Sequence, residues 1–158
     1  MSRTFSLLTN ALVLAGFVII TFCAPLAGIL SPPGKWYASL AKPEWNPPSW
    51  IFGPVWTTLY LMMAVAAWIV WKRDGWRKPL WLYFVQLVLN AAWTPLFFGM
   101  HEIGWAFAEI VLLWFAILIT LRAFHGVSKP AAWLLLPYLA WVSFAAFLNF
   151  TLWRMNPG

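Results

Sequence analysis

The sequence predicts an all-α integral membrane protein, a single domain over residues 1–158 with five transmembrane helices and a structured loop between the first two. Hydrophobic residues make up 63% of the chain and charged residues 9%, whereas soluble domains average about 45–50% and about 25%. A soluble protein could not cover its surface with so few charged residues. Lipid must therefore be the main solvent around this chain. The apolar runs also have the length of roughly 20 residues that crosses hydrocarbon.

The first predicted helix covers residues 5–30 and contains the apolar run that follows Arg3. A secretory signal peptide is the alternative for such an N-terminal run. The run is too long for the apolar region of a signal peptide and lacks a clear small-x-small cleavage site. We therefore predict a membrane helix that ends before the pair Pro32-Pro33.

The longest connection, Ser31 to Asn46, is rich in Pro, Trp and Tyr. Connections of this length are usually functional or disordered, and this composition is not that of a disordered segment. The sequence thus predicts a structured lid. The second helix is expected over residues 47–71, with Asn46 as its N-cap, because proline is tolerated in a first helical turn.

Three further helices are predicted over residues 79–100, 103–121 and 130–153, and two of them begin with a proline. The intervening turns are short and polar. With five spans the termini lie on opposite sides. Seven Lys and Arg residues fall on the side of the N-terminus and three on the other side, so the positive-inside rule predicts a cytoplasmic N-terminus and a lid on the opposite face.

Aromatic and amide side chains recur at helical spacing on three predicted helices. For any one helix, the ordinary structural interpretation is core packing or one interhelical hydrogen bond. Three such faces that converge favour a cavity for a flat apolar ligand. The faces consist of Phe52, Trp56 and Tyr60 on the second helix, Gln86, Asn90, Trp93 and Phe97 on the third, and Tyr138, Trp141, Ala145 and Asn149 on the fifth.

Glu109 is a carboxyl group inside the fourth predicted span. Such a group is expensive in hydrocarbon unless it is neutral, paired or functional. No basic residue is expected at the same depth. The sequence favours a neutral acid that is hydrogen-bonded across helices, and a functional role is the alternative.

Several classes of function find no support in the sequence. Cys23 is the only cysteine and the two histidines are far apart, so no metal site is predicted. No catalytic residues are assigned, because a nucleophile with its base, paired carboxylates and a phosphate-binding loop are all missing. The basic residues lie at the ends of apolar runs, which indicates membrane topology rather than nucleic-acid binding.

Five motifs resemble those of the TspO/MBR family of tryptophan-rich membrane proteins, and together they span most of the chain. They are W-Y-x-x-L-x-K-P-x-W-x-P-P at 36–48, G-P-V-W-T-x-L-Y at 53–60, L-N-x-x-W-x-P-x-F-F-G at 89–99, P-Y-L-x-W at 137–141 and L-N-F-x-x-W-R at 148–154. The resemblance implies a five-helix bundle, a homodimer, and a pocket closed by the first loop. It also implies binding of porphyrins such as protoporphyrin IX and haem, and of isoquinoline carboxamide and benzodiazepine compounds.

The resemblance also implies which residues line the pocket. Family pocket positions correspond to Tyr37, Trp56, Asn90, Trp93, Trp141 and Ala145, and an acidic position near the pocket corresponds to Glu109. Phe150 stands where the C-terminal cholesterol-recognition pattern of eukaryotic members has a tyrosine. The resemblance therefore does not extend to cholesterol.

The combined expectation is a membrane protein that binds a tetrapyrrole between its helices for porphyrin handling or stress signalling. Trp56, Trp93 and Trp141 would stack on the macrocycle, Asn90 would offer hydrogen bonds, and the lid residues Lys35, Lys42 and Trp45 would close over it. No obligatory cofactor is expected. The alternatives are light- or oxidant-driven porphyrin degradation and transport of porphyrins or other lipophilic ligands. A bacterial inner membrane follows from helical spans, since outer-membrane proteins are mostly barrels, although the family resemblance admits the outer membrane.

Overall fold

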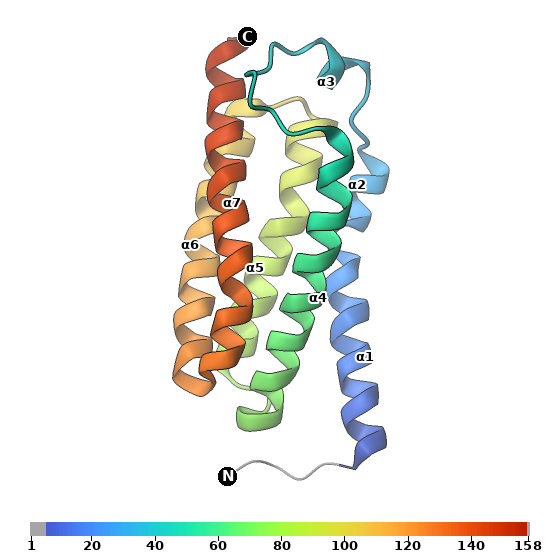
Figure 1. The fold of residues 1–158 in the computed structure, drawn as a ribbon, viewed down its shortest axis with the longest axis vertical. Coiled ribbons are helices and arrows are strands. Elements are labelled where there is room, and N and C mark those ends of the chain that lie inside the picture. The colour runs from blue at the N-terminus through green and yellow to red at the C-terminus, as the bar shows by residue number, and fades with distance from the viewer. Residues whose placement is uncertain (1–5, 158) are drawn as a thin grey trace.

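The computed structural model describes residues 6–157, and these residues form an all-helical bundle (Figure 1). The predicted fold class is confirmed: five of the helical segments are long and apolar enough to cross a membrane. The elements in chain order are α1 (Leu7–Cys23), α2 (Leu26–Leu30), α3 (Lys35–Ser39), α4 (Ser49–Asp74), α5 (Lys78–Thr94), the π-helix η1 (Pro95–Gly99), α6 (Ile103–Val127) and α7 (Lys129–Met155).

The long helices are arranged so that α7 packs against both α6 and α4, while α5 packs against α6 and α1 against α4. The packing between α4 and α5 is much sparser. The start of α1 and the end of α7 lie at opposite ends of the bundle, and the lid lies over the end where α7 finishes (Figure 1). The bundle therefore has a lid end and an opposite end.

The larger cluster of buried residues extends through the half of the bundle away from the lid, and a smaller one around Phe97 and Leu148 lies at the lid end. On α4 the buried residues begin at Leu59, and Met63, Ala64, Ala66, Ala67 and Val70 are fully inaccessible. Alanine allows neighbouring helices to approach closely, which is how helices associate in a membrane that supplies no hydrophobic driving force between them. The first ten residues of α4, which face the lid end, are not buried in this way.

Two predicted boundaries are corrected at prolines. The helix predicted over 5–30 is divided between α1 and α2 at Ala24 and Pro25, because proline has no N–H to continue the helical ladder. The helix predicted from residue 47 begins at Ser49, with Pro48 rather than Asn46 as its N-cap. A residue before proline is disfavoured in the helical region, so Pro47 cannot join the helix.

The two other differences lie at the ends of α5 and α6. The third predicted span ends in the π-helix η1, where the N–H of Met100 bonds the carbonyl of Pro95 at 2.8 Å. The helix predicted to stop at residue 121 continues to Val127. The predicted turn at residues 122–127 is helical because no proline interrupts it.

The lid, residues 31–46, is attached to the bundle by several contacts, including one pair of hydrogen bonds and two stacked ring pairs. Asn156, at the end of α7, exchanges two hydrogen bonds with the backbone of Ala41, at 2.9 and 3.0 Å. The Trp36 ring stacks on His101 in the turn before α6, with centroids 4.1 Å apart. The Trp45 ring stacks on Phe147 of α7 at 5.3 Å. These contacts agree with the prediction of a structured lid.

The beginning of the lid packs tightly against η1. A Cβ atom on Gly99 would lie 2.9 Å from the Ser31 hydroxyl, which is closer than atoms normally approach. We predict that Gly99→Ala lowers the unfolding free energy by about 1 kcal/mol, measured by titration with a denaturing detergent. Gly126 has open space around it, so Gly126→Ala should raise stability by a few tenths to about 1 kcal/mol.

The added variant Ser31→Ala separates this clash from a general effect of the substitution. It removes the oxygen that the new methyl group at position 99 would meet, so the double variant should recover most of the lost stability. A double variant as unstable as Gly99→Ala alone would contradict the proposed contact.

Candidate ligand-binding cavity

A cavity of about 820 Å³ lies beneath the lid, between α4, η1, α5 and α7. It occupies the region where α4 and α5 are packed sparsely. Small-molecule sites in proteins commonly measure about 300–1,000 Å³. The position of the cavity explains why burial on α4 begins only at Leu59.

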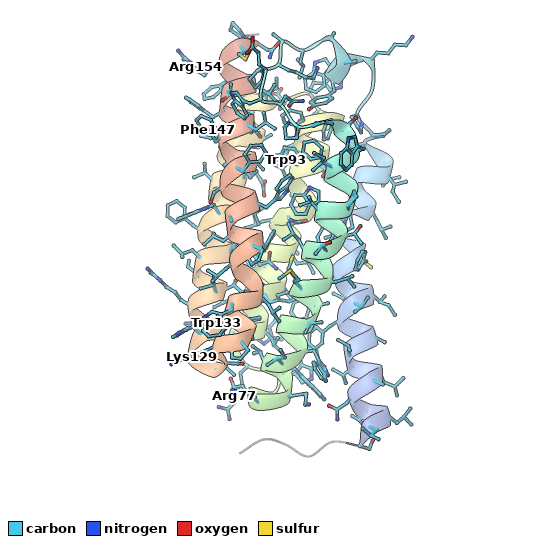
Figure 2. All side chains as sticks on the ribbon, viewed as in Figure 1. Arg77, Trp93, Lys129, Trp133, Phe147 and Arg154 are labelled. Atoms are coloured by element: carbon cyan, nitrogen blue, oxygen red, sulfur yellow. The ribbon has the colours of Figure 1, made fainter. Side chains whose placement is uncertain are left out.

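Three indole rings from three helices surround the cavity: Trp56 from α4, Trp93 from α5 and Trp141 from α7. In the part of the chain that the structure describes, each indole packs on other rings and not on the other two indoles. Trp56 stacks on Tyr60 at 5.4 Å, Trp93 stacks on Phe97 at 5.0 Å, and Trp141 meets Phe52 edge-on at 5.9 Å. Figure 2 shows Trp93 inside the bundle near the lid end. The space between the indoles is the cavity.

A chain of hydrogen bonds closes the cavity on the side of the core. The Tyr60 hydroxyl donates to Oδ1 of Asn90 at 2.7 Å, and Nδ2 of Asn90 donates to the Tyr138 hydroxyl at 2.9 Å. The Tyr138 hydroxyl in turn donates to Oε1 of Gln86 at 2.8 Å. All four side chains are buried. The chain joins α4, α5 and α7 at one level.

A second polar connection ties the lid end of α7 to α5 and α6. The Trp93 indole N–H donates to Oδ1 of Asn149 at 3.0 Å, and Nδ2 of Asn149 donates to the carbonyl of Ile103 at 2.9 Å. Asn149 is buried, so these bonds satisfy an amide that would be costly without partners. They also fix the plane of the Trp93 ring.

The lid contributes Tyr37 and Lys42 to the cavity wall. The Lys42 ammonium donates to the carbonyls of Tyr37, Ala38 and Leu40 and lies 4.7 Å from the centre of the Tyr37 ring. A cation there complements the unpaired carbonyls at the end of α3. Burial raises the pKa of the Tyr37 hydroxyl, and the Asn46 side chain partly opposes that shift.

The structure brings most of the predicted site residues together. Those in the cavity wall are Tyr37, Lys42, Trp56, Asn90, Trp93, Phe97, Trp141 and Ala145. Tyr138 lies behind the wall, where it bonds Asn90. Lys35 is exposed and lies outside the wall, and Trp45 packs on Phe144 and Phe147 rather than facing the cavity.

The expectation for Glu109 is wrong in one respect. Both carboxyl oxygens are buried, but neither has a hydrogen-bond partner among residues 6–157. Glu109 is also absent from the cavity wall. On the neighbouring helix α5, the Asn90 amide is already bonded to Tyr60 and Tyr138. The predicted hydrogen bond across helices therefore does not form.

Some wall residues lie outside the aromatic faces that the sequence singled out. Pro25 and Gly28 come from the break between α1 and α2, and Ile110 and Leu113 come from α6. These residues are as apolar as residues that face lipid. Helical spacing alone therefore could not distinguish positions that line the cavity from positions that face lipid. The Pro25 break was the one available signal, since a proline that interrupts an apolar run marks a local change of direction.

Comparison with known proteins agrees with this architecture. The profile of the TspO/MBR family matches residues 9–154, nearly the whole chain. The chain belongs to the TspO/MBR family. It is 50% identical to the translocator protein of Ovis aries over 129 residues, which cover 78% of this chain and 76% of that protein.

Bacterial members of the TspO/MBR family match equally broadly. The tryptophan-rich protein TspO of Chlorobaculum tepidum is 48% identical over 130 residues, covering 79% of this chain and 82% of that protein. Protein CrtK of Rhodobacter capsulatus is 36% identical over 148 residues, covering 91% and 92%. The family profile, over residues 9–154, includes the lid and all the helices that form the cavity wall.

The bonds of Asn90 point to a structural role. We predict that Asn90→Leu lowers the unfolding free energy of the ligand-free protein by about 1 kcal/mol, because two interhelical bonds of about 0.6 kcal/mol each are lost. Detergent-induced unfolding measures the change. Thr58→Val is the control, since its exposed hydroxyl bonds only the carbonyl of Pro54 in the same helix, and it should leave stability unchanged.

The opposite pattern would contradict this role. If Asn90→Leu left stability unchanged but abolished ligand binding, Asn90 would act as a ligand contact rather than as a tie between helices.

Proposed function

We propose that this protein binds a flat, largely apolar tetrapyrrole such as protoporphyrin IX or haem in the cavity under the lid. The observation that carries the proposal is the cavity of about 820 Å³ flanked by indoles from three helices. The proposal agrees with what the family resemblance implies. Isoquinoline carboxamide and benzodiazepine compounds, which are also flat and apolar, would compete for the same space.

The energetic basis of the proposed binding is stacking on aromatic rings. Each aromatic contact is worth about 0.5–1.5 kcal/mol beyond burial. Trp56, Trp93 and Trp141 already hold their orientations through neighbouring rings or a hydrogen bond, so little side-chain freedom is lost on binding. Several such contacts, added to the burial of a large apolar ring, support affinity of about 1 μM.

The polar groups of the wall divide into two kinds. Asn90, Trp93 and Asn149 are already bonded within the protein. The Trp141 indole N–H is buried and has no hydrogen-bond partner among the described residues. This donor would gain a bond from a ligand acceptor once the Trp141 ring turned its N–H toward the cavity, whereas the others would have to exchange bonds they already have. At the lid, Lys42 is the cation placed to meet a ligand carboxylate.

The setting of the proposed function is a bilayer, with the N-terminal side of the bundle in the cytoplasm. The excess of Lys and Arg at the end opposite the lid supports this orientation. A bacterial cell membrane, which the helical spans favour, and a homodimer, which the family resemblance implies, are part of the same proposal. In a Cys23→Ser background, alkylation of single cysteines introduced at Lys35 and at Lys78, from outside intact cells, would distinguish the two orientations.

Filling the cavity tests the proposal directly. We predict that Ala145→Phe weakens protoporphyrin IX binding by about tenfold or more, equivalent to about 1.4 kcal/mol, because the new ring occupies the space between Trp141 and Asn149. Quenching of tryptophan fluorescence during titration of the purified protein measures the affinity. Ala140→Phe is the control: it adds the same ring to an exposed position of α7 and should bind as the wild type does. Equal affinity of the two variants would contradict the proposed site.

The unpaired indole donor gives a second test. Trp141→Phe keeps an aromatic ring and removes the N–H, so we predict a loss of about threefold to tenfold in affinity for protoporphyrin IX, the usual value of one hydrogen bond. Trp133→Phe, at an exposed indole, is the matched control. If both variants bind with wild-type affinity, the ligand makes no bond to Trp141.

A further inference from the structure

The end of the bundle opposite the lid carries a strong excess of positive charge. Its residues are Lys72, Arg73, Arg77, Lys78, Arg122 and Lys129, and Asp74 is the one described carboxylate among them. The lid end has Lys35, Lys42 and Arg154 together with Glu44 and Glu102. Figure 2 shows Arg77 and Lys129 near one end and Arg154 at the other. The two ends therefore present different surfaces to the lipid headgroups.

Three of these cations share one arrangement with a tryptophan. Lys72 is four residues after Trp68 on α4, Arg77 is four residues before Trp81 at the start of α5, and Lys129 is four residues before Trp133 on α7. Residues four apart lie on the same face of a helix, which applies to the pairs within α4 and α7, whereas Arg77 is the N-cap residue just before α5. In the first pair the ammonium of Lys72 lies 4.5 Å from the centre of the Trp68 ring.

The direction of each helix gives the three pairs the same orientation. The helix α4 ends at this end of the bundle, whereas α5 and α7 begin there (Figure 1). In every pair the Cα atom of the tryptophan therefore lies about 6 Å farther from this end of the bundle than that of the basic residue, the rise of four helical residues. Figure 2 shows Lys129 nearer to this end of the bundle than Trp133. No such pair occurs at the lid end among the described residues.

The indoles of two pairs face outward. The exposed fractions are 64% for Trp81 and 62% for Trp133. Among the described residues the only ion pair is Arg77 with Asp74, at 3.3 Å, so Lys129 has no carboxylate partner. A phospholipid offers the two complementary groups in the same order, a phosphate outside and ester carbonyls deeper. An indole N–H at that depth can donate to an ester carbonyl.

We propose that the Arg77–Trp81 and Lys129–Trp133 pairs are binding sites for single anionic phospholipids of the leaflet at this end. The cation holds the phosphate and the indole holds the glycerol ester region. A headgroup with a net negative charge, such as phosphatidylglycerol, is favoured over a zwitterionic one. A zwitterionic headgroup brings an ammonium group that needs a carboxylate partner. Among the described residues Lys129 has no carboxylate beside it, and Arg77 has only Asp74.

The test is lipid selectivity in a membrane. The protein is reconstituted in phosphatidylcholine vesicles that contain traces of spin-labelled phosphatidylglycerol or spin-labelled phosphatidylcholine. Electron paramagnetic resonance gives the fraction of each label that the protein immobilises. The wild type should favour phosphatidylglycerol by about fivefold, the gain expected for one cation near an anionic headgroup, and the preference should fall as salt screens the charges.

Three variants separate the pairs from net charge. The double variant Arg77→Gln, Lys129→Gln should lose most of the preference. The control Lys35→Gln, Arg154→Gln removes the same charge from the lid end and should keep it. The variant Trp81→Leu, Trp133→Leu keeps every charge and should lower the preference by about twofold or more. Thermal melting verifies that each variant is folded.

Two outcomes would overturn the proposal. One is a wild-type protein with no preference between the two labels. The other is an equal loss in both charge variants, which would mean that net charge alone attracts the lipid. Neither result depends on the porphyrin cavity, which lies toward the lid end.

Discussion

The hydrogen-bond chain from Tyr60 through Asn90 and Tyr138 to Gln86 joins α4, α5 and α7 at the level where the packed core ends and the cavity begins. Below it, fully buried alanines let α4 pack closely against its neighbours. Above it, α4 and α5 are packed sparsely and the space between them remains open. In a membrane no hydrophobic force between helices would hold such a gap at a fixed width, so directional bonds must do so. The width of the cavity therefore depends on these four side chains.

The lid end completes the cavity by a different set of interactions. Asn156 bonds the lid backbone at Ala41, and Trp36 stacks on His101. These contacts join the lid to the end of α7 and to the turn before α6. Lys42 donates a hydrogen bond to the carbonyl of Leu40, just after α3, and also lines the cavity. The lid is thus held as a folded cover over the aromatic rings beneath it.

Much of this architecture was predictable from the sequence, and the reasons are specific. Helical spacing placed Trp56, Asn90, Trp93 and Trp141 on inward faces, since a period of about four residues selects one side of a helix. The sequence did not reveal what Asn90 bonds, because its partners Tyr60 and Tyr138 are 30 and 48 residues away in the chain. That Glu109 has no hydrogen-bond partner among residues 6–157 depends equally on tertiary packing. Two helix ends were predicted wrongly. The start of α4 was placed at Pro47, although Pro48 follows it directly, and α6 was ended before Arg122, although the helix continues past this residue.

Photolabelling tests the central claim, that a flat ligand lies between the three indoles above the hydrogen-bond chain, most directly. A protoporphyrin derivative that carries a photoreactive diazirine is irradiated with the reconstituted protein, and the modified residues are identified by mass spectrometry. We expect labels on the cavity walls at residues 52–60, 90–98 and 141–149, and we expect excess protoporphyrin IX to suppress them. Labels confined to lipid-facing residues such as Trp105 and Phe115, with no suppression by excess ligand, would contradict it.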